Sequence, residues 1–341
     1  MIDMTKRKNI AVVGATGAVG TVFLKMLEER NFPVDDLRLC ASERSLGKRI
    51  KVNGIDIEIE LLTSKLVEEA DMVFVSASSE ISHLAASMLG ESDTILIDDS
   101  SAFRMNSDVP LVVPEVNAGD LDQVKNIVAI PNCSTTPLVM ALKPLHDHYL
   151  VKRVIVDTYQ SVSGTGTAAL DELKTQTKQF LDNDFIQTNV YPHQIAFNVL
   201  PHIEPFLPNG YTSEEMKMLN ETRKILNLPD LNLSATCVRV PVMIGHSEAV
   251  HAEFHNSVDL ERSIDLLHDF PGIRVVDEPT SGLYPMPIDS EGDDDVLVGR
   301  IRGDISCDNS IAFWLASDNL RKGAALNAIQ IAEEILRRKI R

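Results

Sequence analysis

One cysteine, Cys133, has the sequence surroundings of a nucleophile. It lies in the segment 127–136, IVAIPNCSTT, after a short apolar run and before apolar residues at helical spacing, 138–145. The start of a helix presents unpaired backbone N–H groups and the positive end of the helix dipole, which favour a thiolate over a thiol and can hold an oxyanion. Cysteine is also a common core residue, so a buried structural role for Cys133 stays open at this point.

Three glycines near the start have the spacing of a phosphate-binding loop. Gly14, Gly17 and Gly20, in VVGATGAVG, follow the first expected strand and open the first expected helix. A dinucleotide loop uses such glycines for a tight turn, for close approach of the backbone to the phosphates and for close helix packing. The spacing differs from the commoner G-x-G-x-x-G, and a glycine-rich turn that binds no ligand is the alternative.

The end of the second expected strand, 41–45 (ASERS), holds the residues that would contact the adenine ribose. Arg44, with serine hydroxyls on both sides, suits the 2′-phosphate of NADP. Glu43 could instead bond the free 2′-hydroxyl of NAD. We favour NADP, because adjacent side chains can point apart.

His246, in GHSE, and Arg239, in CVRVPV, are polar residues beside strand-like runs in the second half. A histidine that titrates near neutrality suits proton exchange, although a lone histidine is more often structural. An arginine in a valine-rich strand needs an anion, because an unpaired buried charge is costly. That anion is either a substrate carboxylate or an internal Asp or Glu.

Residues 211–217, YTSEEMK, begin a helix. Thr212 and Glu215 have the spacing of a capping box, which gives Glu215 a structural role. Glu214 and Lys217, three residues apart, share a helix face and could bind an ammonium and an anion, respectively. A surface ion pair between them is the alternative.

The pattern of elements predicts two kinds of sheet. Up to Cys133, β-rich runs alternate with helical patterns, which predicts a mostly parallel sheet covered on both faces. After Cys133 the strands alternate in polarity, which predicts an α+β domain whose sheet has one open face. The last segment, 319–338, predicts a helix with a small-residue face that packs closely on another element, and the acidic stretch 289–295 predicts a solvated loop. The expected strands are 9–13, 37–41, 72–76, 94–98, 127–131, 151–159, 235–242 and 247–254.

Composition narrows the class of protein. A chain of 341 residues is longer than most single domains, so two domains are expected. The net charge of −18 argues against nucleic acid or an anionic membrane as a partner. The four cysteines lie far apart, so neither a disulfide framework nor a metal site is expected. The start, MIDMTKRKNI, lacks the apolar core of a signal peptide, and we expect a soluble cytoplasmic protein.

Eight motifs together resemble one known family. They are GATGAVG, S-x-R-S, PNCST, TYQSVSG, EEMK, CVRVPV, GHSE and KGAALNAIQIAE. In this order and approximate spacing, the chain resembles the aspartate-semialdehyde dehydrogenases over its whole length. The resemblance implies NADPH-dependent reduction of L-aspartyl 4-phosphate to L-aspartate 4-semialdehyde and phosphate, through a cysteine thioester, in the biosynthesis of lysine, threonine, methionine and diaminopimelate.

The resemblance also implies roles at matching positions. Cys133 would be the nucleophile, His246 the general acid and base, and Gln160 the residue that orients the acyl group. Substrate contacts would be Arg239 to the carboxylate, Glu214 to the amino group, and Arg104, Asn132 and Lys217 to the phosphate. NADP would be held by Gly14, Thr16, Gly17, Ala18, Val19, Ser42, Arg44, Ser45, Ser163, Gly164 and Asn327.

The family architecture completes these expectations. It implies an α/β chain with a Rossmann-like dinucleotide-binding domain, 1–132 with the returning segment 319–341. It also implies an α+β catalytic and dimerisation domain, 133–318, similar to the C-terminal domain of glyceraldehyde-3-phosphate dehydrogenase. Members of the family are homodimers or homotetramers, and no metal is implied.

Three other functions would use some of the same residues. N-acetylglutamyl-phosphate reductase shares the cofactor and the thioester, but Glu214 argues against it because an acetylated nitrogen carries no charge. A non-catalytic NADP-binding homologue is disfavoured by the joint presence of Cys133, Gln160, Arg239 and His246. A cysteine hydrolase would leave the dinucleotide loop unexplained.

Overall fold

The computed structural model describes residues 7–340 and divides the chain into two compact units. The first unit is Met1–Asn132 with Ala324–Arg341, and the second is Cys133–Gly323. Residues 1–6, part of the segment on which the expectation of no signal peptide depends, lie outside the described residues. Within residues 7–340, no helix has the length and apolar character needed to cross a membrane.

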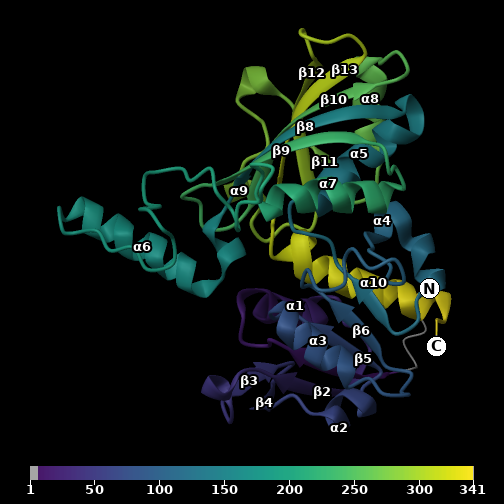
Figure 1. Ribbon diagram of the computed structural model, residues 1–341, viewed down its shortest axis with the longest axis vertical. Helices are drawn as coiled ribbons and strands as arrows, with labels where there is room; N and C mark the ends of the chain where they lie inside the picture. Colours follow the sequence, from purple (N-terminus) through teal and green to yellow (C-terminus); the bar gives the residue numbers. More distant parts are fainter. Residues whose placement is uncertain (1–6, 341) are drawn as a thin grey trace. The chain divides into compact units, whose positions relative to one another are not determined.

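A seven-stranded sheet forms the centre of the first unit (Figure 1). Its order is β3-β4-β2-β1-β5-β6-β7, and every neighbouring pair is parallel except β3 with β4. The mostly parallel sheet is therefore confirmed. The strands are β1 (Lys8–Val13), β2 (Val34–Cys40), β3 (Arg49–Val52), β4 (Ile55–Glu60), β5 (Met72–Val75), β6 (Ile95–Asp98) and β7 (Ile127–Ala129).

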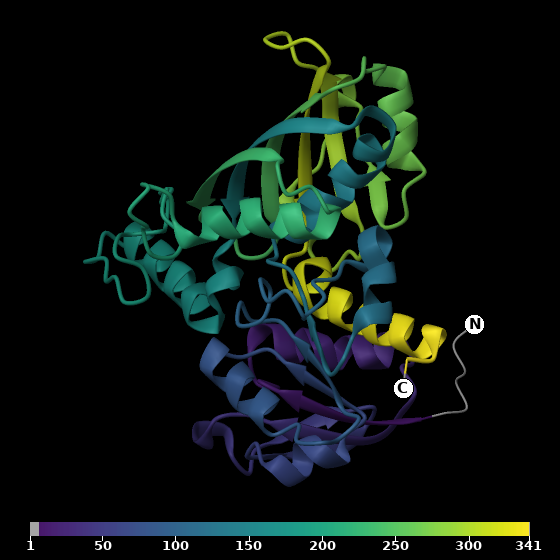
Figure 2. The same ribbon diagram turned by 45° about the vertical axis from the view of Figure 1, so that its right-hand side comes forward.

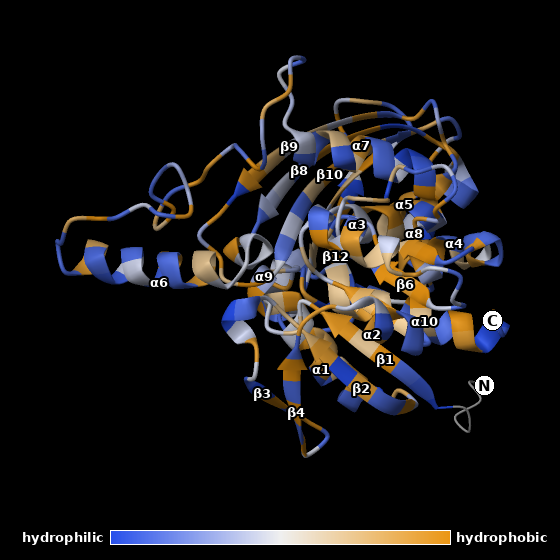
Figure 3. Ribbon diagram, turned by 60° about the horizontal axis from the view of Figure 1, so that its bottom comes forward, coloured by the Kyte–Doolittle hydropathy of each residue, from blue (hydrophilic) through white to orange (hydrophobic). Residues whose placement is uncertain are grey.

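Helices cover both faces of this sheet, as predicted. Along β1, Ile10 and Val12 pack with α1 (Ala18–Glu29) and α10 (Leu326–Arg338), whereas the intervening residues pack with α2 (Ser64–Glu69) and α3 (Ser79–Ser87). Since neither face meets water, the central strands are continuous apolar runs, and β6 is mostly orange in Figure 3.

The hairpin of β3 and β4 was not predicted. Its turn is Asn53-Gly54, and both residues have positive φ, at 49° and 80°. An Asn-Gly pair between two β-rich runs is the commonest signal of a two-residue hairpin. The sequence therefore contained the signal, but the strands are only four and six residues long.

The segment 319–338 is not one regular helix. β13 (Ser310–Ser317) is followed by a π-helical turn, Arg321–Ala325, and only then by α10. The carboxylate of Asp318 accepts hydrogen bonds from the N–H groups of Leu320 and Arg321, which fixes the turn before the helix begins. The close packing of the small-residue face is confirmed, because alanines of α10 are buried against α1. The guanidinium of Arg30, the C-cap of α1, also donates two hydrogen bonds to Glu333 on α10, each 2.7 Å long.

A six-stranded mixed sheet forms the centre of the second unit, which confirms the α+β prediction. Its order is β11-β12-β13-β10-β8-β9, with β8 parallel to β9 and antiparallel to β10. One face is covered by α5 (Thr135–Tyr149), α7 (Ser213–Leu226) and α8 (Leu260–His268), while α6 (Thr167–Leu181) extends away from the sheet (Figures 1 and 2). The remaining strands are β8 (Val151–Gln160), β9 (Asn232–Arg239), β10 (His246–Phe254), β11 (Ile273–Val275) and β12 (Val296–Gly303).

Two expectations for the second unit are wrong in detail. The strand expected at 235–242 ends at Arg239, because Pro241 has no N–H to continue the ladder. The acidic stretch 289–295 is not simply a solvated loop. It begins within the short helix α9 (Pro287–Ser290), and its carboxylates pair with two arginines, Asp293 with Arg274 and Asp294 with Arg321.

The glycine loop gives a stability prediction. A Cβ at Gly20 would lie 2.2 Å from the carbonyl oxygen of Gly14, so the loop or the helix would have to move. We expect Gly20→Ala to lower the free energy of unfolding by about 1–3 kcal/mol, the usual cost of overpacking. Urea unfolding followed by circular dichroism measures it. Gly119→Ala, where a Cβ meets no atom within 4 Å, is the control. Equal unfolding midpoints for both variants and the wild type would contradict the prediction.

Candidate active site

Three predicted site residues lie in one row at the end of the six-stranded sheet. The register pairs Arg239 on β9 with Gln160 on β8, and it pairs Tyr159 with Ser247, which sets His246 on β10 beside Gln160. Since all three side chains are buried, they lie on the helix-covered face. Segments separated by some 80 residues of sequence are brought together by strand pairing alone.

Arg239 is a buried cation that forms an ion pair with no carboxylate of residues 7–340. Its side chain is 5% exposed, and Nη1 donates a 2.7 Å hydrogen bond to the carbonyl oxygen of Ser161, whereas Nε is buried without a partner. Within residues 7–340, no carboxylate forms an ion pair with it. The alternative of an internal Asp or Glu is therefore wrong for the described residues. A buried guanidinium of this kind is suited to an anionic ligand.

His246 is fully buried beside the same arginine. Its Nδ1 accepts a hydrogen bond from the backbone N–H of Ser161 at 3.0 Å. A Cβ at Gly164 would lie 3.1 Å from Nη1 of Arg239 and 3.2 Å from Nε2 of His246, so both groups face one glycine. Burial, and then the positive charge of Arg239, lower the pKa of His246 well below its ordinary value. The imidazole is therefore neutral at pH 7.

The start of α7 places the carboxylate of Glu214 against Gln160 and the ammonium of Lys217 against that carboxylate. The capping box of Thr212 and Glu215 is confirmed, since each side chain accepts a hydrogen bond from the backbone N–H of the other residue. Nε2 of Gln160 donates to the buried carboxylate of Glu214 at 3.1 Å. Nζ of Lys217 lies 3.4 Å from Glu214. Lys217 also pairs with Glu204, so an ion pair does form here.

Cys133 lies just before a helix, as predicted. It precedes Ser134, the N-cap of α5, and its side chain is partly exposed. The backbone of Gly323 lies against it, because a Cβ at that glycine would be 2.9 Å from the Cβ of Cys133. The alternative of a fully buried structural cysteine fits Cys40 and Cys237 instead.

The first unit holds the expected cofactor loop. Gly14 has φ of +89°, and a Cβ there would lie 2.0 Å from the carbonyl oxygen of Ser76, so only glycine fits the turn. Gly17 is the N-cap of α1, and no side chain caps this helix start. Thr16 is exposed beside it, followed by the partly buried Ala18 and Val19. The backbone N–H groups of a helix start without a side-chain cap are suited to bind a phosphate.

The other predicted residues of the first unit occupy three places. After β2, Ser42 and Arg44 are exposed and Ser45 is buried. Within the described residues no carboxylate, Glu43 included, forms an ion pair with Arg44. Arg104 and Asn132 are buried, and Nη2 of Arg104 donates to the carbonyl oxygen of Asp99 at 2.8 Å. Nδ2 of the buried Asn327 donates to the carbonyl oxygen of Val112 at 2.8 Å, which ties α10 to its own unit.

Sequence reasoning missed two polar groups beside His246. Oδ1 of Asn319 accepts hydrogen bonds from the N–H of Gly245 and from the hydroxyls of Ser161 and Ser163. The buried carboxyl of Glu248 has no hydrogen-bond partner in the described structure, and burial raises its pKa well above its usual value. For Asn319, the sequence offered a signal in the polar run Ser317-Asp318-Asn319, which follows an apolar strand. For Glu248, the sequence has no comparable signal.

Comparison with known proteins identifies the family. Residues 9–124 match the family model described as semialdehyde dehydrogenase, NAD binding domain, and residues 142–322 match the semialdehyde dehydrogenase dimerisation domain. An aspartate-semialdehyde dehydrogenase of Aquifex aeolicus is 48% identical over 332 residues, covering 96% of this chain and 98% of that protein. The chain belongs to the aspartate-semialdehyde dehydrogenase family.

Solved structures of the family agree with this membership. Aspartate semialdehyde dehydrogenase II of Vibrio cholerae, complexed with ASA, has a TM-score of 0.94 and 45% identity, covering 97% of this chain and 99% of that one. The Candida albicans enzyme with NADP has a TM-score of 0.78 and 27% identity, covering 98% and 100%. The resemblance found in the ordered motifs is confirmed. The chain is an oxidoreductase of amino-acid biosynthesis with an NAD(P)-binding domain and a dimerisation domain.

Thiol reactivity tests the different surroundings of the cysteines. Burial raises the pKa of Cys40 to about 12 and that of Cys237 well above its usual value, whereas Cys133 and Cys307 are partly exposed. At pH 7 a thiol of pKa 12 has roughly a thousandth of the thiolate of an ordinary cysteine. We expect iodoacetamide to label Cys133 and Cys307 in the folded protein and the other two only after unfolding. Peptide mass mapping measures this, and labelling of Cys237 before Cys133 would contradict it.

Proposed function

We propose that this chain catalyses the reversible, NADPH-dependent reduction of L-aspartyl 4-phosphate to L-aspartate 4-semialdehyde and phosphate. The observation that carries the proposal is Arg239, a buried guanidinium beside His246 with no carboxylate partner in the described structure. A strongly acidic chain places here a buried cation that would match a substrate carboxylate. The names of its relatives support the same substrate.

The proposed chemistry begins at Cys133. Its thiolate adds to the acyl-phosphate carbon, the tetrahedral oxyanion is held by backbone N–H groups at the start of α5, and phosphate leaves to give a thioester. NADPH, when bound, supplies the hydride that reduces this thioester. His246 is the proposed acid–base group, and Nε2 is the atom left for this work because Nδ1 is bonded to Ser161.

Each polar group of the substrate would have its own partner or partners. Arg239 binds the carboxylate as a planar fork, and Glu214 binds the ammonium group. Gln160, held by Glu214, orients the acyl group. The phosphate contacts are assigned to three residues, namely Arg104, Asn132 and Lys217.

We propose that residues 1–132 with 319–341 form the cofactor-binding domain and that residues 133–318 form the catalytic and dimerisation domain, whereas the first compact unit resumes at Ala324. The open helix start at Gly17 fits a pyrophosphate. The guanidinium of Arg44, which pairs with no carboxylate in the part of the chain that the structure describes, fits the 2′-phosphate of NADP. The remaining proposed contacts are Gly14, Thr16, Ala18, Val19, Ser42, Ser45, Ser163, Gly164 and Asn327.

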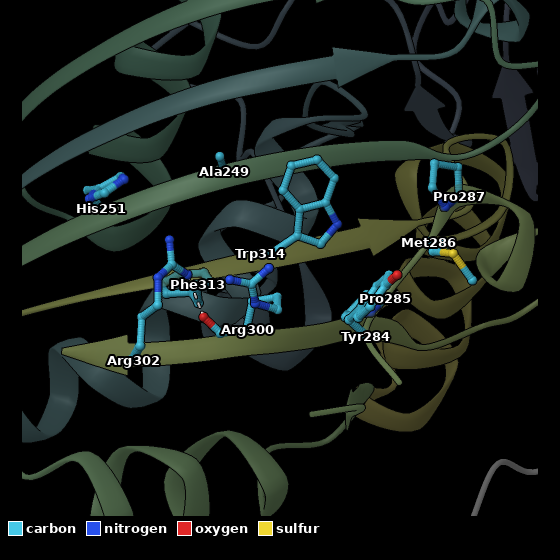
Figure 4. A pocket seen from close by; sticks show the side chains of 10 residues that line it. All are labelled: Ala249, His251, Tyr284, Pro285, Met286, Pro287, Arg300, Arg302, Phe313 and Trp314. Atoms are coloured by element: carbon cyan, nitrogen blue, oxygen red, sulfur yellow. Dashed lines mark hydrogen bonds between the residues drawn. The ribbon is translucent and has the colours of Figure 1, made fainter. Parts of the chain in front are cut away.

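We also propose that the uncovered face of the six-stranded sheet pairs two copies, giving a homodimer or homotetramer in the cytosol. Tyr159 and Trp314 lie ring to ring on this face, with centroids 5.2 Å apart. A pocket of about 320 Å³ beside Trp314, lined also by Tyr284 and Arg300, hollows the same face (Figure 4). The reaction would serve the biosynthesis of lysine, threonine, methionine and diaminopimelate.

The proposed substrate is tested by phosphate-dependent reduction of NADP in the reverse reaction. Aspartate semialdehyde is compared with N-acetylglutamate semialdehyde, whose nitrogen has no charge to meet Glu214. We expect turnover with the first only. Turnover with the acetylated substrate alone would replace the proposal, and no reduction with either would refute it.

Cys133→Ser should abolish the thioester, because a hydroxyl is a far poorer nucleophile at neutral pH than a thiolate. We expect kcat to fall by roughly three or more orders of magnitude while NADP binding stays unchanged. Intact-mass spectra after mixing with substrate should show an acyl adduct on the wild type and on the control Cys307→Ser. An adduct mapped to Cys40, Cys237 or Cys307 would overturn the assignment.

Arg239→Lys keeps the charge but loses the two-pronged geometry, so the acyl carbon should be misplaced relative to Cys133. We expect kcat/KM for the semialdehyde to fall by roughly 10- to 100-fold.

In contrast, Lys217→Ala should raise KM for phosphate. Arg262→Lys, on the exposed side of α8, is the control. If Lys217→Ala leaves the phosphate dependence unchanged, Glu214, Lys217 and Glu204 are only a structural ion-pair cluster.

Arg44→Ala should weaken NADP binding far more than NAD binding. The lost charge-assisted contact is typically worth about 1.5–3 kcal/mol, roughly 10- to 150-fold in affinity. Fluorescence titration of both coenzymes measures it, with Lys48→Ala as a control for loss of a nearby exposed charge. Equal losses for both coenzymes would make Glu43 the candidate ribose ligand.

A further inference from the structure

A long irregular stretch of the second unit follows α6. From Asp182 to Thr212, all of which the structure describes, no helix or strand forms. Irregular stretches of this length are uncommon inside a compact domain, and those that are ordered usually serve a function. Residues 187–200, here named the return segment, are fixed by hydrogen bonds to α6 and to β9. The return segment is therefore an ordered element that the proposed reaction does not yet use.

Two buried polar side chains of α6 fix the return segment. Glu172 is 7% exposed and Gln176 is fully buried, although α6 extends away from the sheet (Figure 1). The carboxylate of Glu172 accepts the N–H groups of 189–191, and Oε1 of Gln176 accepts those of 195–196. Nε2 of Gln176 donates to Glu172 at 3.0 Å and to the carbonyl oxygen of Gln187 at 2.9 Å. These bonds satisfy backbone groups that no helix or strand satisfies here.

The far end of the return segment pairs with the backbone of Arg239. The N–H of Leu200 donates to the carbonyl oxygen of Arg239 at 2.9 Å, and the N–H of Arg239 donates to the carbonyl oxygen of Leu200 at 2.8 Å. β9 is the last strand of its sheet, so this bridge covers its free edge at the residue that carries the cation. The return segment thus holds the main chain of Arg239.

The side chain of Tyr191, in the return segment, holds the turn that lies against the guanidinium. Its hydroxyl donates to Oγ1 of Thr165 at 2.9 Å, next to Gly164. A Cβ at Gly164 would lie 3.1 Å from Nη1 of Arg239, so the turn and the cation are in close contact. The Tyr191 ring packs against one small apolar cluster, which joins the turn, α6 and the return segment. The cluster is formed by Val162, Ala169, Leu173, Ile195, Ala196 and Leu200.

Arg239 and Tyr191 also interact electrostatically. Burial raises the pKa of Tyr191, and the hydrogen bond to Thr165 and the positive charge of Arg239 oppose this rise in part. The phenol is therefore neutral at pH 7, and it keeps the proton that it donates to Thr165.

We propose that Tyr191 is a positioning residue for Arg239, held in place by the buried polar pair on α6. The return segment fixes the cation in two ways. Its bridge at Leu200 fixes the end of β9, and Tyr191 limits, through the turn 162–165, where the guanidinium can lie. Tyr191 therefore acts on the anion site without being its ligand.

The position of this turn matters because Gly164 lies between two functional groups. A Cβ there would be 3.2 Å from Nε2 of His246 as well as close to Arg239. The turn therefore helps to set how far an anion bound by Arg239 lies from the acid–base group. A misplacement of about 1 Å can cost roughly 100-fold in rate. That the anion is the substrate carboxylate rests on the proposed function, whereas the fixing of the turn does not.

Two conservative variants test the hydrogen bond. Tyr191→Phe removes the donor and Thr165→Val removes the acceptor. We expect each to lower kcat/KM for aspartate semialdehyde roughly 3- to 10-fold, and the double variant to lose no more than either one, because both break the same bond. KM for NADP should stay unchanged. Kinetics of phosphate-dependent NADP reduction measure this. The control is Tyr211→Phe, which breaks a similar 3.0 Å bond to Ser234 and should behave as the wild type.

A second comparison tests whether Tyr191 acts through Arg239. In the Arg239→Lys background the guanidinium is gone, so Tyr191→Phe should there cost less than about 2-fold in kcat/KM. Equal losses in both backgrounds would show that Tyr191 only supports the fold near the site, and the positioning proposal would be wrong. No loss in the wild-type background would overturn it as well.

Hydrogen exchange of the free full-length protein, followed by mass spectrometry, tests the fixed turn without substrate. Glu172→Ala should make peptides that cover 187–196 and 161–166 exchange roughly 5-fold faster or more. Tyr191→Phe, which keeps every backbone acceptor, should speed exchange in 161–166 alone. Asp259→Ala, which removes the side-chain cap of α8, is the control and should leave both regions unchanged.

The outcomes separate the two proposals. If the wild type uses aspartate semialdehyde but Tyr191→Phe changes neither kcat/KM nor the exchange of 161–166, the positioning proposal is wrong and the proposed function stands. If exchange changes as expected but aspartate semialdehyde is not a substrate, the proposed function fails and the fixing of the turn by Tyr191 stands.

Discussion

The second unit depends on one constraint, the burial of the positive charge of Arg239. Arg239 ends β9 inside the protein, and its guanidinium is bonded within the described structure to one carbonyl oxygen, that of Ser161. A buried charge is tolerated only with donors and acceptors placed around it, so strand register here decides chemistry as well as packing. The same register sets Gln160 and His246 beside the arginine. The site is thus a property of how three strands align.

The arginine acts electrostatically on the histidine. The cation lowers the pKa of His246 in addition to the effect of burial, so the ring beside the guanidinium is neutral. A second cation beside Arg239 would be costly inside the protein, whereas a neutral ring can lie against it. The net charge of −18 therefore does not prevent the chain from burying a cation at this place.

Local chemistry was predictable from the sequence, and long-range pairing was not. The glycine turn at Gly14, the capping box at Thr212 and the helix start after Cys133 each depend on a few neighbouring residues, and the structure has all three. Asn319 was assigned only to a helix, because its partners lie some 75 and 160 residues earlier in the chain. Helical periodicity likewise could not show that Asp318 would hold a π-helical turn before α10. Resemblance to a family supplied roles that spacing alone had left open.

Ser161 contributes both of its backbone polar groups to the site. Its N–H is bonded to His246 and its carbonyl oxygen to Arg239, so one residue of backbone lies between the proton-carrying group and the anion-binding group. If the guanidinium moved toward a bound carboxylate, the carbonyl group of Ser161 would be displaced with it. The displacement would be transmitted to the imidazole through the N–H of the same residue. Neither contact involves a side chain of Ser161. Substitution of Ser161 by alanine would leave both in place. At this residue only a change to the main chain itself, such as an ester in place of an amide, would reveal the link.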